Sequence, residues 1–436
     1  MKYREFLETI YPKEFVQDLL DSLNTSPLGG VRLNMLKYSG FNPLGGLKKH
    51  PFVKNGFIYD KETEQLGKNP YHDLGLYYIQ EPSAMMVGEL LDVKPKDLVI
   101  DLCAAPGGKS THVGAFLDDD GLLIANDINS KRCLDLSENI ARMGIKNCYV
   151  TNESVDKLVS SFGAIFDKVI LDAPCSGEGM FRKNKAAEED WSEDKVLRLS
   201  SLQKELILKA YQLLKKSGIM IYSTCTFNKY ENEDVVRHLL NNTNASLIGI
   251  KEMAGVDRGI EMEEAIHLFP NHFQGEGHFM ALIKCNDEQP IFGRFKSEKP
   301  VDSKTLKTFK DFVNSALNAD FEAKRIINNS NHLYYLPKTS LDMRGLKVLR
   351  FGLYLGELKN NHFVPSHDLA LASTPSMWKS VIELDENQVQ AYKKGLSINA
   401  TCANGYALLT FNNYSLGFGK VVNGVVKNHY PKYLRR

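Results

Sequence analysis

The sequence predicts an α/β fold in which a mostly parallel sheet is covered by helices on both faces. From residue 98 onward, short continuous apolar runs alternate with stretches of helical period. Continuous apolar strands joined by helical crossovers are typical of parallel sheets that are buried on both sides. With 436 residues, the chain is long enough for two or three domains of which this sheet forms one.

The predicted elements of this core run from residue 98 to residue 285. Strands are expected at 98–104, 121–128, 147–152, 166–174, 219–226 and 278–285, and helices at 130–143, 194–217 and 232–242. Gly144 and Gly218 directly follow two of these helical stretches, and lysines precede Gly218. Glycine after a helix and lysine in its last turn both favour a helix end, so we expect the glycines to act as caps.

Regions of different composition flank the core. Residues 1–75 begin with an amphipathic stretch that predicts a helix near 4–23. Residues 286–305 are polar, contain two prolines and predict a linker. Residues 306–436 have the short strands and turns of a small α+β or barrel-like module. We therefore expect an N-terminal region at 1–75, a core at 76–285, a linker at 286–305 and a C-terminal region at 306–436.

Two stretches near the ends of the chain are basic. Residues 22–59 and 401–436 each contain five Lys or Arg and no Asp or Glu, and tyrosines are interleaved in the second. A surface that follows phosphates and stacks bases needs this composition. An ordinary solvated basic face is the alternative for either stretch. Because the formal net charge is only +1, two such stretches favour RNA binding in both flanking regions.

Composition also excludes several classes of protein. No run approaches the eighteen apolar residues of a membrane span, and Glu5 and Glu8 lie where a signal peptide would be basic and then apolar. We therefore expect a cytoplasmic protein without a membrane partner. The seven cysteines form no CxxC pair and have no His cluster beside them, which predicts free thiols and no metal site.

The stretch "DLCAAPGGKSTHVG" at 101–114 predicts a cofactor loop, since it follows a strand and opens a helix. Small residues there let the backbone approach a ligand closely. The loop is not GxGxxG, and Cys103 occupies the place where a phosphate-binding loop needs glycine six residues before Lys109. Asp127 follows the next strand, where a carboxylate can bind ribose hydroxyls. Loop and acid together suit S-adenosylmethionine, although Asp127 is alternatively a helix N-cap.

Two cysteines raise the question of a nucleophile. Cys175 and Cys225 each follow a predicted strand, at the sheet edge where ligands bind in such folds. Carbon 5 of a pyrimidine is too weakly nucleophilic to attack a methylsulfonium until a thiolate adds to carbon 6, so a cysteine suits this reaction. Asp172 can hydrogen-bond the base edge and hold a proton on ring nitrogen 3. These arguments do not say which cysteine attacks.

Three motifs resemble those of the Nol/Nop/Sun family of RNA (cytosine-5)-methyltransferases. They are "DLCAAPGGKS" (101–110), "LDAPCSGEG" (171–179) and "STCTFNKYENE" (223–233). Further similar segments are "VRLNMLK" (31–37) and "YIQEPSAMMV" (78–87), and 417–435 is similar to the PUA-like tail of bacterial ribosomal-RNA methyltransferase F proteins. The resemblance implies a Rossmann-like class I S-adenosylmethionine-dependent methyltransferase core, a small N-terminal α+β region and a C-terminal PUA-like module.

The resemblance also implies a role for individual residues. Cys225 matches the family's nucleophile, and Cys175 the cysteine that helps to break down the covalent adduct. The implied cofactor contacts are Cys103, Ala104, Ala105, Pro106, Gly107, Gly108, Lys109, Asp127, Ser154 and Asp172. The family has an acid where this chain has Ser154, and Glu153 is adjacent, so the contact at this position differs from the family pattern.

These observations predict a monomeric enzyme that methylates carbon 5 of cytosine in RNA, with small-subunit (16S) ribosomal RNA as the substrate. Transfer RNA is the alternative substrate. A non-catalytic ribosome-assembly or RNA-binding factor is a second reading, but the presence of Cys225 and Asp172 disfavours it. A redox switch, in which Cys175 and Cys225 form a disulfide, is a third.

Overall fold

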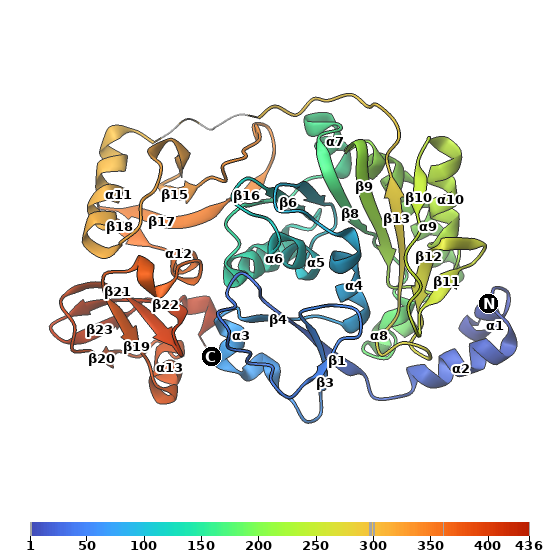
Figure 1. Ribbon diagram of the computed structural model, residues 1–436, viewed down its shortest axis with the longest axis horizontal. Helices are drawn as coiled ribbons and strands as arrows, with labels where there is room; N and C mark the ends of the chain where they lie inside the picture. The colour runs from blue at the N-terminus through green and yellow to red at the C-terminus, as the bar shows by residue number, and fades with distance from the viewer. Residues whose placement is uncertain (1, 296–298, 300, 361, 436) are drawn as a thin grey trace.

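The structure is a computed structural model that describes residues 2–295, 299, 301–360 and 362–435. Parts of the expected linker, 296–298 and 300, lie outside the described residues. Figure 1 shows the α/β core in the centre and at the right, the N-terminal sheet below it and the C-terminal elements at the left. Among the described residues, no helix is long and apolar enough to cross a lipid bilayer.

The core is built on one large sheet whose centre is parallel. The five parallel strands, in spatial order, are β7 (Cys148–Thr151), β6 (Leu122–Asn126), β5 (Leu98–Asp101), β8 (Phe166–Asp172) and β9 (Leu214–Thr224). Antiparallel strands extend the sheet beyond β9: β13 (His278–Lys284), β12 (Met262–Leu268), β11 (Asp257–Gly259) and, beside β13, β10 (Ser246–Ile248). The predicted α/β class is confirmed.

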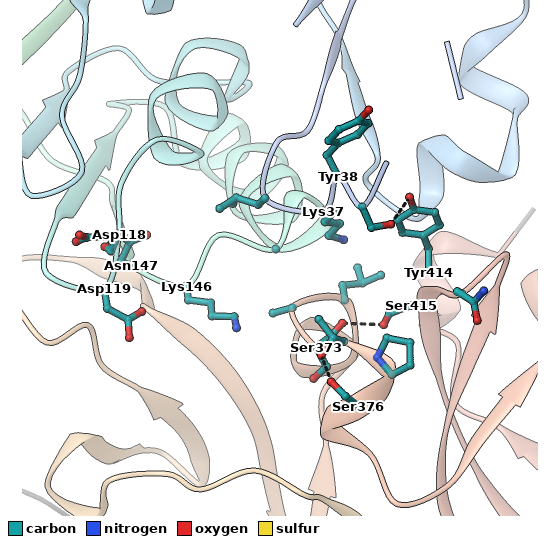
Figure 2. Close-up of a pocket in the computed structure, with 18 of the residues that line it drawn as sticks. Lys37, Tyr38, Asp118, Asp119, Lys146, Asn147, Ser373, Ser376, Tyr414 and Ser415 are labelled. Carbon is teal, nitrogen blue, oxygen red and sulfur yellow. Dashed lines mark hydrogen bonds between the residues drawn. The ribbon is translucent and has the colours of Figure 1, made fainter. Parts of the chain in front are cut away.

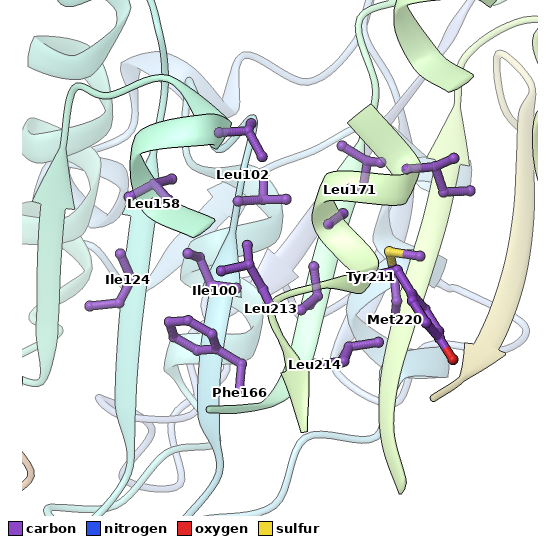
Figure 3. Packing of buried hydrophobic residues seen from close by; sticks show 14 of the residues in the cluster. Ile100, Leu102, Ile124, Leu158, Phe166, Leu171, Tyr211, Leu213, Leu214 and Met220 are labelled. Atoms are coloured by element: carbon purple, nitrogen blue, oxygen red, sulfur yellow. The ribbon is translucent and has the colours of Figure 1, made fainter. Parts of the chain in front are cut away.

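Helices cover both faces of this sheet and define two hydrophobic clusters. One face carries α4 (Pro82–Leu91), α5 (Gly108–Gly114) and α6 (Ser130–Met143), and the other α7 (Val155–Phe162), α9 (Glu193–Tyr211) and α10 (Glu233–Asn242). Figure 3 shows Ile100, Ile124 and Phe166 of the strands packed with Leu158 of α7. Each such fully buried side chain contributes about 1.5–3 kcal/mol to folding. These two layers hold the strand ends rigidly in place.

The predicted helix at 194–217 is wrong at its C-terminal end. Helix α9 ends at Tyr211, and β9 begins only three residues later at Leu214, which pairs with Phe166 of β8. Gly218 is therefore a strand residue and not a helix cap. The amphipathic period of the helix continues by coincidence into the buried Leu213, which lies in the turn after α9, and Leu214, the first residue of β9. Gly144, in contrast, caps α6 in the left-handed conformation as expected, with φ 77°.

The N-terminal region consists of two helices and a small sheet. Its elements are α1 (Tyr3–Glu8), α2 (Lys13–Leu23), β1 (Leu28–Leu33), β2 (Lys48–Lys49), β3 (Gly56–Asp60), η1 (Leu66–Lys68), α3 (Pro70–Asp73) and β4 (Tyr77–Ile79). The sheet has the order β2-β3-β1-β4. The single helix expected near 4–23 is two helices, because Pro12 lacks an N–H and instead begins the second one as its N-cap.

The C-terminal part contains two further sheets. The first unit comprises α11 (Ser303–Ala316), η3 (Ala323–Arg325), β14 (Ile326–Asn329), β15 (His332–Tyr335), β17 (Leu353–Lys359), β18 (His362–Pro365) and α12 (His367–Leu371). The second comprises β19 (Val381–Glu383), α13 (Glu386–Lys393), β20 (Ile398–Asn399), β21 (Gly405–Phe411), β22 (Tyr414–Val422), β23 (Val425–Asn428) and η5 (Lys432–Leu434). Strand β16 (Val348–Phe351) leaves the first unit and pairs with β7, so the C-terminal part extends the core sheet.

The two ends of the chain pack against each other. One hydrophobic cluster contains side chains of the N-terminal sheet and of the second C-terminal unit, among them Tyr59 and Leu409. Lys393 pairs with Asp73, and the hydroxyls of Ser39 and Tyr414 lie 2.8 Å apart. The blue and red segments accordingly meet in the lower part of Figure 1. Two basic stretches that are far apart in the sequence therefore belong to neighbouring parts of the molecule.

Not every cation of these stretches is available to a ligand. Arg32 is fully buried, and the Lys37 ammonium donates to two backbone carbonyls, of Leu74 and Arg142. The exposed lysines are Lys48, Lys49, Lys54, Lys420, Lys427 and Lys432. Of the four interleaved tyrosines, Tyr414 and Tyr430 are buried and Tyr433 is exposed. The basic surface is thus smaller than the sequence indicates.

Candidate active site at the carboxyl edge of the sheet

The loop between β5 and α5 turns sharply at Gly107. This residue is the N-cap of α5 with φ 111°, a left-handed conformation that favours glycine, and its N–H donates to the Ala104 carbonyl at 2.7 Å. A Cβ atom at this position would lie 3.2 Å from Leu136 and 3.4 Å from Asn139. The loop therefore depends on glycine both for its backbone conformation and for its fit against α6.

Asp127 binds this loop from the end of β6. Its carboxylate accepts from the Ala105 N–H at 3.3 Å and lies 3.4 Å from the Arg132 guanidinium. The N-cap of α6 is Asn129, whose side chain accepts from two amides of the first turn. The alternative interpretation of Asp127 as the cap is therefore wrong, although its second carboxylate oxygen accepts from the Asn129 N–H at 2.8 Å.

Ser154 and Glu153 both form hydrogen bonds with backbone N–H groups in this structure. Ser154 is the N-cap of α7 and accepts from the Lys157 N–H at 3.3 Å. The Glu153 carboxylate accepts from the Lys347 N–H in the segment that leads into β16, at 2.6 Å. Neither of these hydrogen bonds depends on an acidic side chain at position 154, where the family has one.

The two cysteines meet at the ends of neighbouring strands. Parallel pairing of β8 with β9 sets Asp172 beside Ser223, so the segments after both strands leave the sheet together. The sulfur atoms of Cys175 and Cys225 are 3.3 Å apart, and the Cys225 N–H points to the Cys175 sulfur at 3.4 Å. The hydrogen bond with Cys225, together with burial, raises the pKa of the Cys175 thiol well above its ordinary value. Cys175 therefore keeps its proton and can donate it to the other sulfur.

Asp172 lies beside the cysteines in a cluster of donors. Its carboxylate accepts from Lys109 Nζ at 2.7 Å and from Ser223 Oγ at 2.8 Å. Burial alone would raise the pKa of this carboxyl, but the charge of Lys109 and the contacts with His278 and Lys109 hold it well below its usual range. Burial alone would lower the pKa of Lys109, but the charge of Asp172 and the hydrogen bond with it have the larger effect and raise this pKa. Asp172 is thus an ionised acceptor and Lys109 a charged donor.

The structure adds His278 to the site. Its imidazole is buried, with Nε2 3.5 Å from the Asp172 carboxylate and Nδ1 3.1 Å from the Gly277 carbonyl. Sequence reasoning considered only the ends of parallel strands, whereas β13 is antiparallel and its first residue reaches the same edge. The signal was present in "GHF", a polar residue directly before the apolar run 279–283.

A cavity of about 810 Å³ lies elsewhere (Figure 2). The cavity is lined by residues 36–39, 117–119, 371–376 and 413–415 and by Lys146. Cys175, Cys225 and the loop at 103–109 do not line it. Among the described residues, no group of three His, Cys, Asp or Glu side chains is placed to hold a metal ion. The cysteine cluster is therefore identified as the candidate site by its chemistry and not by the size of a cavity.

A doubly wound sheet with a glycine-rich loop after its first strand and acids at the next strand ends defines a Rossmann-like methyltransferase core. Four family models match the chain in order: N-terminal domain of 16S rRNA methyltransferase RsmF (2–82), 16S rRNA methyltransferase RsmB/F (88–284), RsmF rRNA methyltransferase first C-terminal domain (311–372) and Methyltransferase RsmF PUA domain (379–436). The chain belongs to the RsmB/F family and is an RNA methyltransferase.

Relatives and solved structures agree with this membership. The ribosomal RNA small subunit methyltransferase F of Vibrio vulnificus is 30% identical, over 100% of this chain and 97% of its own, and that of Shewanella oneidensis is 31% identical, over 93% and 90%. The crystal structure of a methyltransferase homolog protein from Pyrococcus horikoshii is 28% identical with a TM-score of 0.54, over 64% of this chain and 96% of that one. NSun6 from Pyrococcus horikoshii, solved with SFG, shares the fold at 22% identity with a TM-score of 0.60, over 66% and 98%.

Proposed function

We propose that the protein transfers a methyl group from S-adenosylmethionine to carbon 5 of cytosine in small-subunit (16S) ribosomal RNA. The observation that carries this proposal is the pair of thiols 3.3 Å apart, beside an ionised Asp172, at the ligand-binding edge of a methyltransferase sheet. Relatives similar over the full chain are named for the small-subunit RNA, which supports this substrate class.

Cysteine chemistry fits carbon 5 because this carbon is not nucleophilic in the intact ring. In the proposed cycle the Cys225 thiolate forms a bond to carbon 6, and the electron pair of the 5,6 double bond moves into the ring. Carbon 5 becomes enamine-like and bonds to the methyl carbon, while the bond from that carbon to the sulfonium sulfur of the donor breaks and leaves a neutral thioether. A base then removes the proton from carbon 5, the double bond re-forms, and the thiolate leaves. Cys175, which keeps its proton beside Cys225, suits the final departure of that sulfur.

The neighbouring polar groups fit the edge of a cytosine. Asp172 accepts hydrogen bonds, so it can bind the exocyclic amino group or a proton on ring nitrogen 3. Lys109 donates, which suits the carbonyl oxygen of the base. Uracil presents an oxygen in place of the amino group and would face the Asp172 carboxylate unfavourably. Donors near the ring also stabilise the charge that develops when the thiolate adds.

The loop fits a cationic methyl donor. Asp127 accepts from the Ala105 N–H of this loop, and Asp172 pairs with Lys109 at its end. Burial, and then the charges of Asp101, Asp172 and Asp127, raise the pKa of the Cys103 thiol. Burial raises the pKa of Asp101 to about 7. We propose that residues 103–109, Asp127, Ser154 and Asp172 hold S-adenosylmethionine, with the ribose hydroxyls at Asp127. When bound, this cofactor supplies a methyl group on a positively charged sulfur.

Replacing Gly107 by valine is expected to abolish cofactor binding. The reason is backbone strain together with contact between the new side chain and α6, since φ is 111° and the Cβ position is already 3.2 Å from Leu136. Calorimetric titration with S-adenosylmethionine should show at least a tenfold loss of affinity. Gly177→Val is the matched control, because Gly177 also has positive φ but has open space around it and lies outside the loop. Equal affinity in wild type and Gly107→Val would remove the loop from the site.

RNA from cells with and without the gene tests the proposed function. Bisulfite sequencing should find at least one cytosine of 16S ribosomal RNA that resists conversion only when the gene is present, and purified protein should restore it in vitro. If loss of the gene removes conversion-resistant cytosines from transfer RNA only, the substrate is transfer RNA. Unchanged RNA in both classes, despite normal expression, would support a non-catalytic assembly factor and contradict the proposal.

A further inference from the structure

The two cysteine segments are joined by a reciprocal pair of buried carboxylates. Glu178 follows Cys175 by three residues, yet its carboxylate accepts from the backbone N–H of Phe227, two residues after Cys225, at 2.8 Å. Glu231 follows Cys225 by six residues, yet it accepts from the backbone N–H of Ser176, directly after Cys175, at 2.9 Å. Each segment thus carries the group that binds the other.

Glu231 holds the Cys175 segment on both sides of the cysteine. Besides Ser176, its carboxylate accepts from Gln203 Nε2 at 2.8 Å, and the same Gln203 nitrogen donates to the Pro174 carbonyl at 2.8 Å. The residues before and after Cys175 are therefore both connected to Glu231. Loss of this carboxylate would release the Cys175 sulfur more directly than the Cys225 sulfur.

Glu178 holds the Cys225 segment in the same manner. It accepts from Phe227 and from Asn228 Nδ2, the latter at 2.8 Å, and the Gly179 N–H donates to the Cys225 carbonyl at 2.9 Å. Trp191 Nε1 also donates to Glu178, at 3.2 Å, from outside both segments. These contacts fix the chain from the Cys225 carbonyl to Asn228.

The pair is costly in a purely structural role. Both carboxylates are fully buried, and Asn228 Nδ2 lies within 2.9 Å of each. In the part of the chain that the structure describes, no Lys or Arg forms a salt bridge with either. Burial raises the pKa of both groups, and their mutual repulsion adds to the shift at Glu231. Apolar side chains of the same size would fill this space without the cost of burying two acids. The carboxylates therefore have a role that packing does not supply, which is to hold the backbone of the cysteine segments through hydrogen bonds.

We propose that Glu178 and Glu231 are positioning residues that act on opposite steps of the reaction. Glu178 places the attacking sulfur of Cys225, and Glu231 places Cys175 for release of the product. This inference rests on the proposed function. It predicts that two chemically identical substitutions in one buried network have different kinetic effects, whereas a structural role would make their effects alike.

Glu231→Gln and Glu178→Gln test the inference. Glutamine keeps the size of the side chain but replaces one acceptor oxygen by a donor, which leaves one neighbouring donor unpaired. In Glu231→Gln, the denaturant-resistant protein–RNA adduct should rise at least roughly tenfold during turnover although both cysteines are present. In Glu178→Gln, single-turnover adduct formation should slow by roughly tenfold to a hundredfold without accumulation, because small displacements of a nucleophile have effects of this size.

Controls separate this inference from the proposed function and from misfolding. Glu261→Gln is the matched surface control, since that side chain is 85% exposed. Melting temperature and S-adenosylmethionine affinity should match wild type, and Glu231→Asp and Glu178→Asp, which keep the charge, replace any glutamine variant that does not fold. Equal slowing of formation and release in both variants, or no change in either, would overturn the inference. If neither Cys175→Ala nor Cys225→Ala traps an adduct and no methyl group reaches RNA, the proposed function itself fails.

Discussion

Cys225→Ala is expected to lose methyl transfer by at least roughly a thousandfold, on the order of 4 kcal/mol of barrier. Alanine cannot add to carbon 6, so carbon 5 stays unreactive and the covalent route is closed. Transfer of a labelled methyl group from S-adenosylmethionine to RNA, followed under single-turnover conditions, measures this loss. The substitution removes one sulfur from a half-buried position, so the fold should be kept.

The controls for this variant are cofactor binding and a different cysteine. Calorimetry should give the wild-type affinity for S-adenosylmethionine, because Cys225 lies outside the loop. Cys285→Ala, at a buried cysteine directly after the far end of β13, should keep methyl transfer near the wild-type rate. Near-normal transfer by Cys225→Ala would remove Cys225 as the nucleophile.

The elements that the sequence predicted well are those with a local signal. Helix α6 has the predicted bounds, because Gly144 ends it in a left-handed conformation. Strands of the parallel centre were found as short apolar runs. The end of α9 was wrong because no local signal separates the last helical turn from Leu213 and Leu214, which are buried for different reasons.

Pairings between distant segments had no such signal. Strand β16 joins the core sheet from the C-terminal part, and the N-terminal sheet shares a hydrophobic cluster with the last unit of the chain. Both follow from tertiary packing that a residue-by-residue pattern does not encode. The burial of Arg32, which reduces the basic surface, belongs to the same class of unpredicted contact.

The residues of the candidate site likewise divide into those that have a local sequence signal and those that only the fold brings together. Cys175, Cys225 and Asp172 were found because strand ends in a parallel sheet meet at one edge, and the structure does bring them together. His278 was missed because it begins an antiparallel strand. Glu178 and Glu231 were missed because acids in a loop are normally exposed, and only the fold reveals that each binds the other cysteine's segment.

Cys175→Ala is expected to form the covalent adduct and to retain it. The Cys175 thiol lies 3.3 Å from the Cys225 sulfur and its pKa is raised. In the proposed cycle its removal takes away the proton donor for departure of that sulfur and leaves the attacking group in place. Turnover should fall by at least roughly a hundredfold while methylated RNA remains attached to protein. Denaturing electrophoresis of enzyme mixed with RNA should show a slower band that is absent for wild type.

The double variant decides which sulfur attacks. Cys175→Ala combined with Cys225→Ala should lose the slower band, because no nucleophile remains. If Cys175 were the attacking thiol, the pattern would invert, with adduct absent in Cys175→Ala and retained in Cys225→Ala. Geometry alone does not separate these cases, since both sulfurs lie at the same edge. The raised pKa of the Cys175 thiol agrees with its proposed role as the proton donor, and the adduct pattern of the two single variants decides which sulfur attacks.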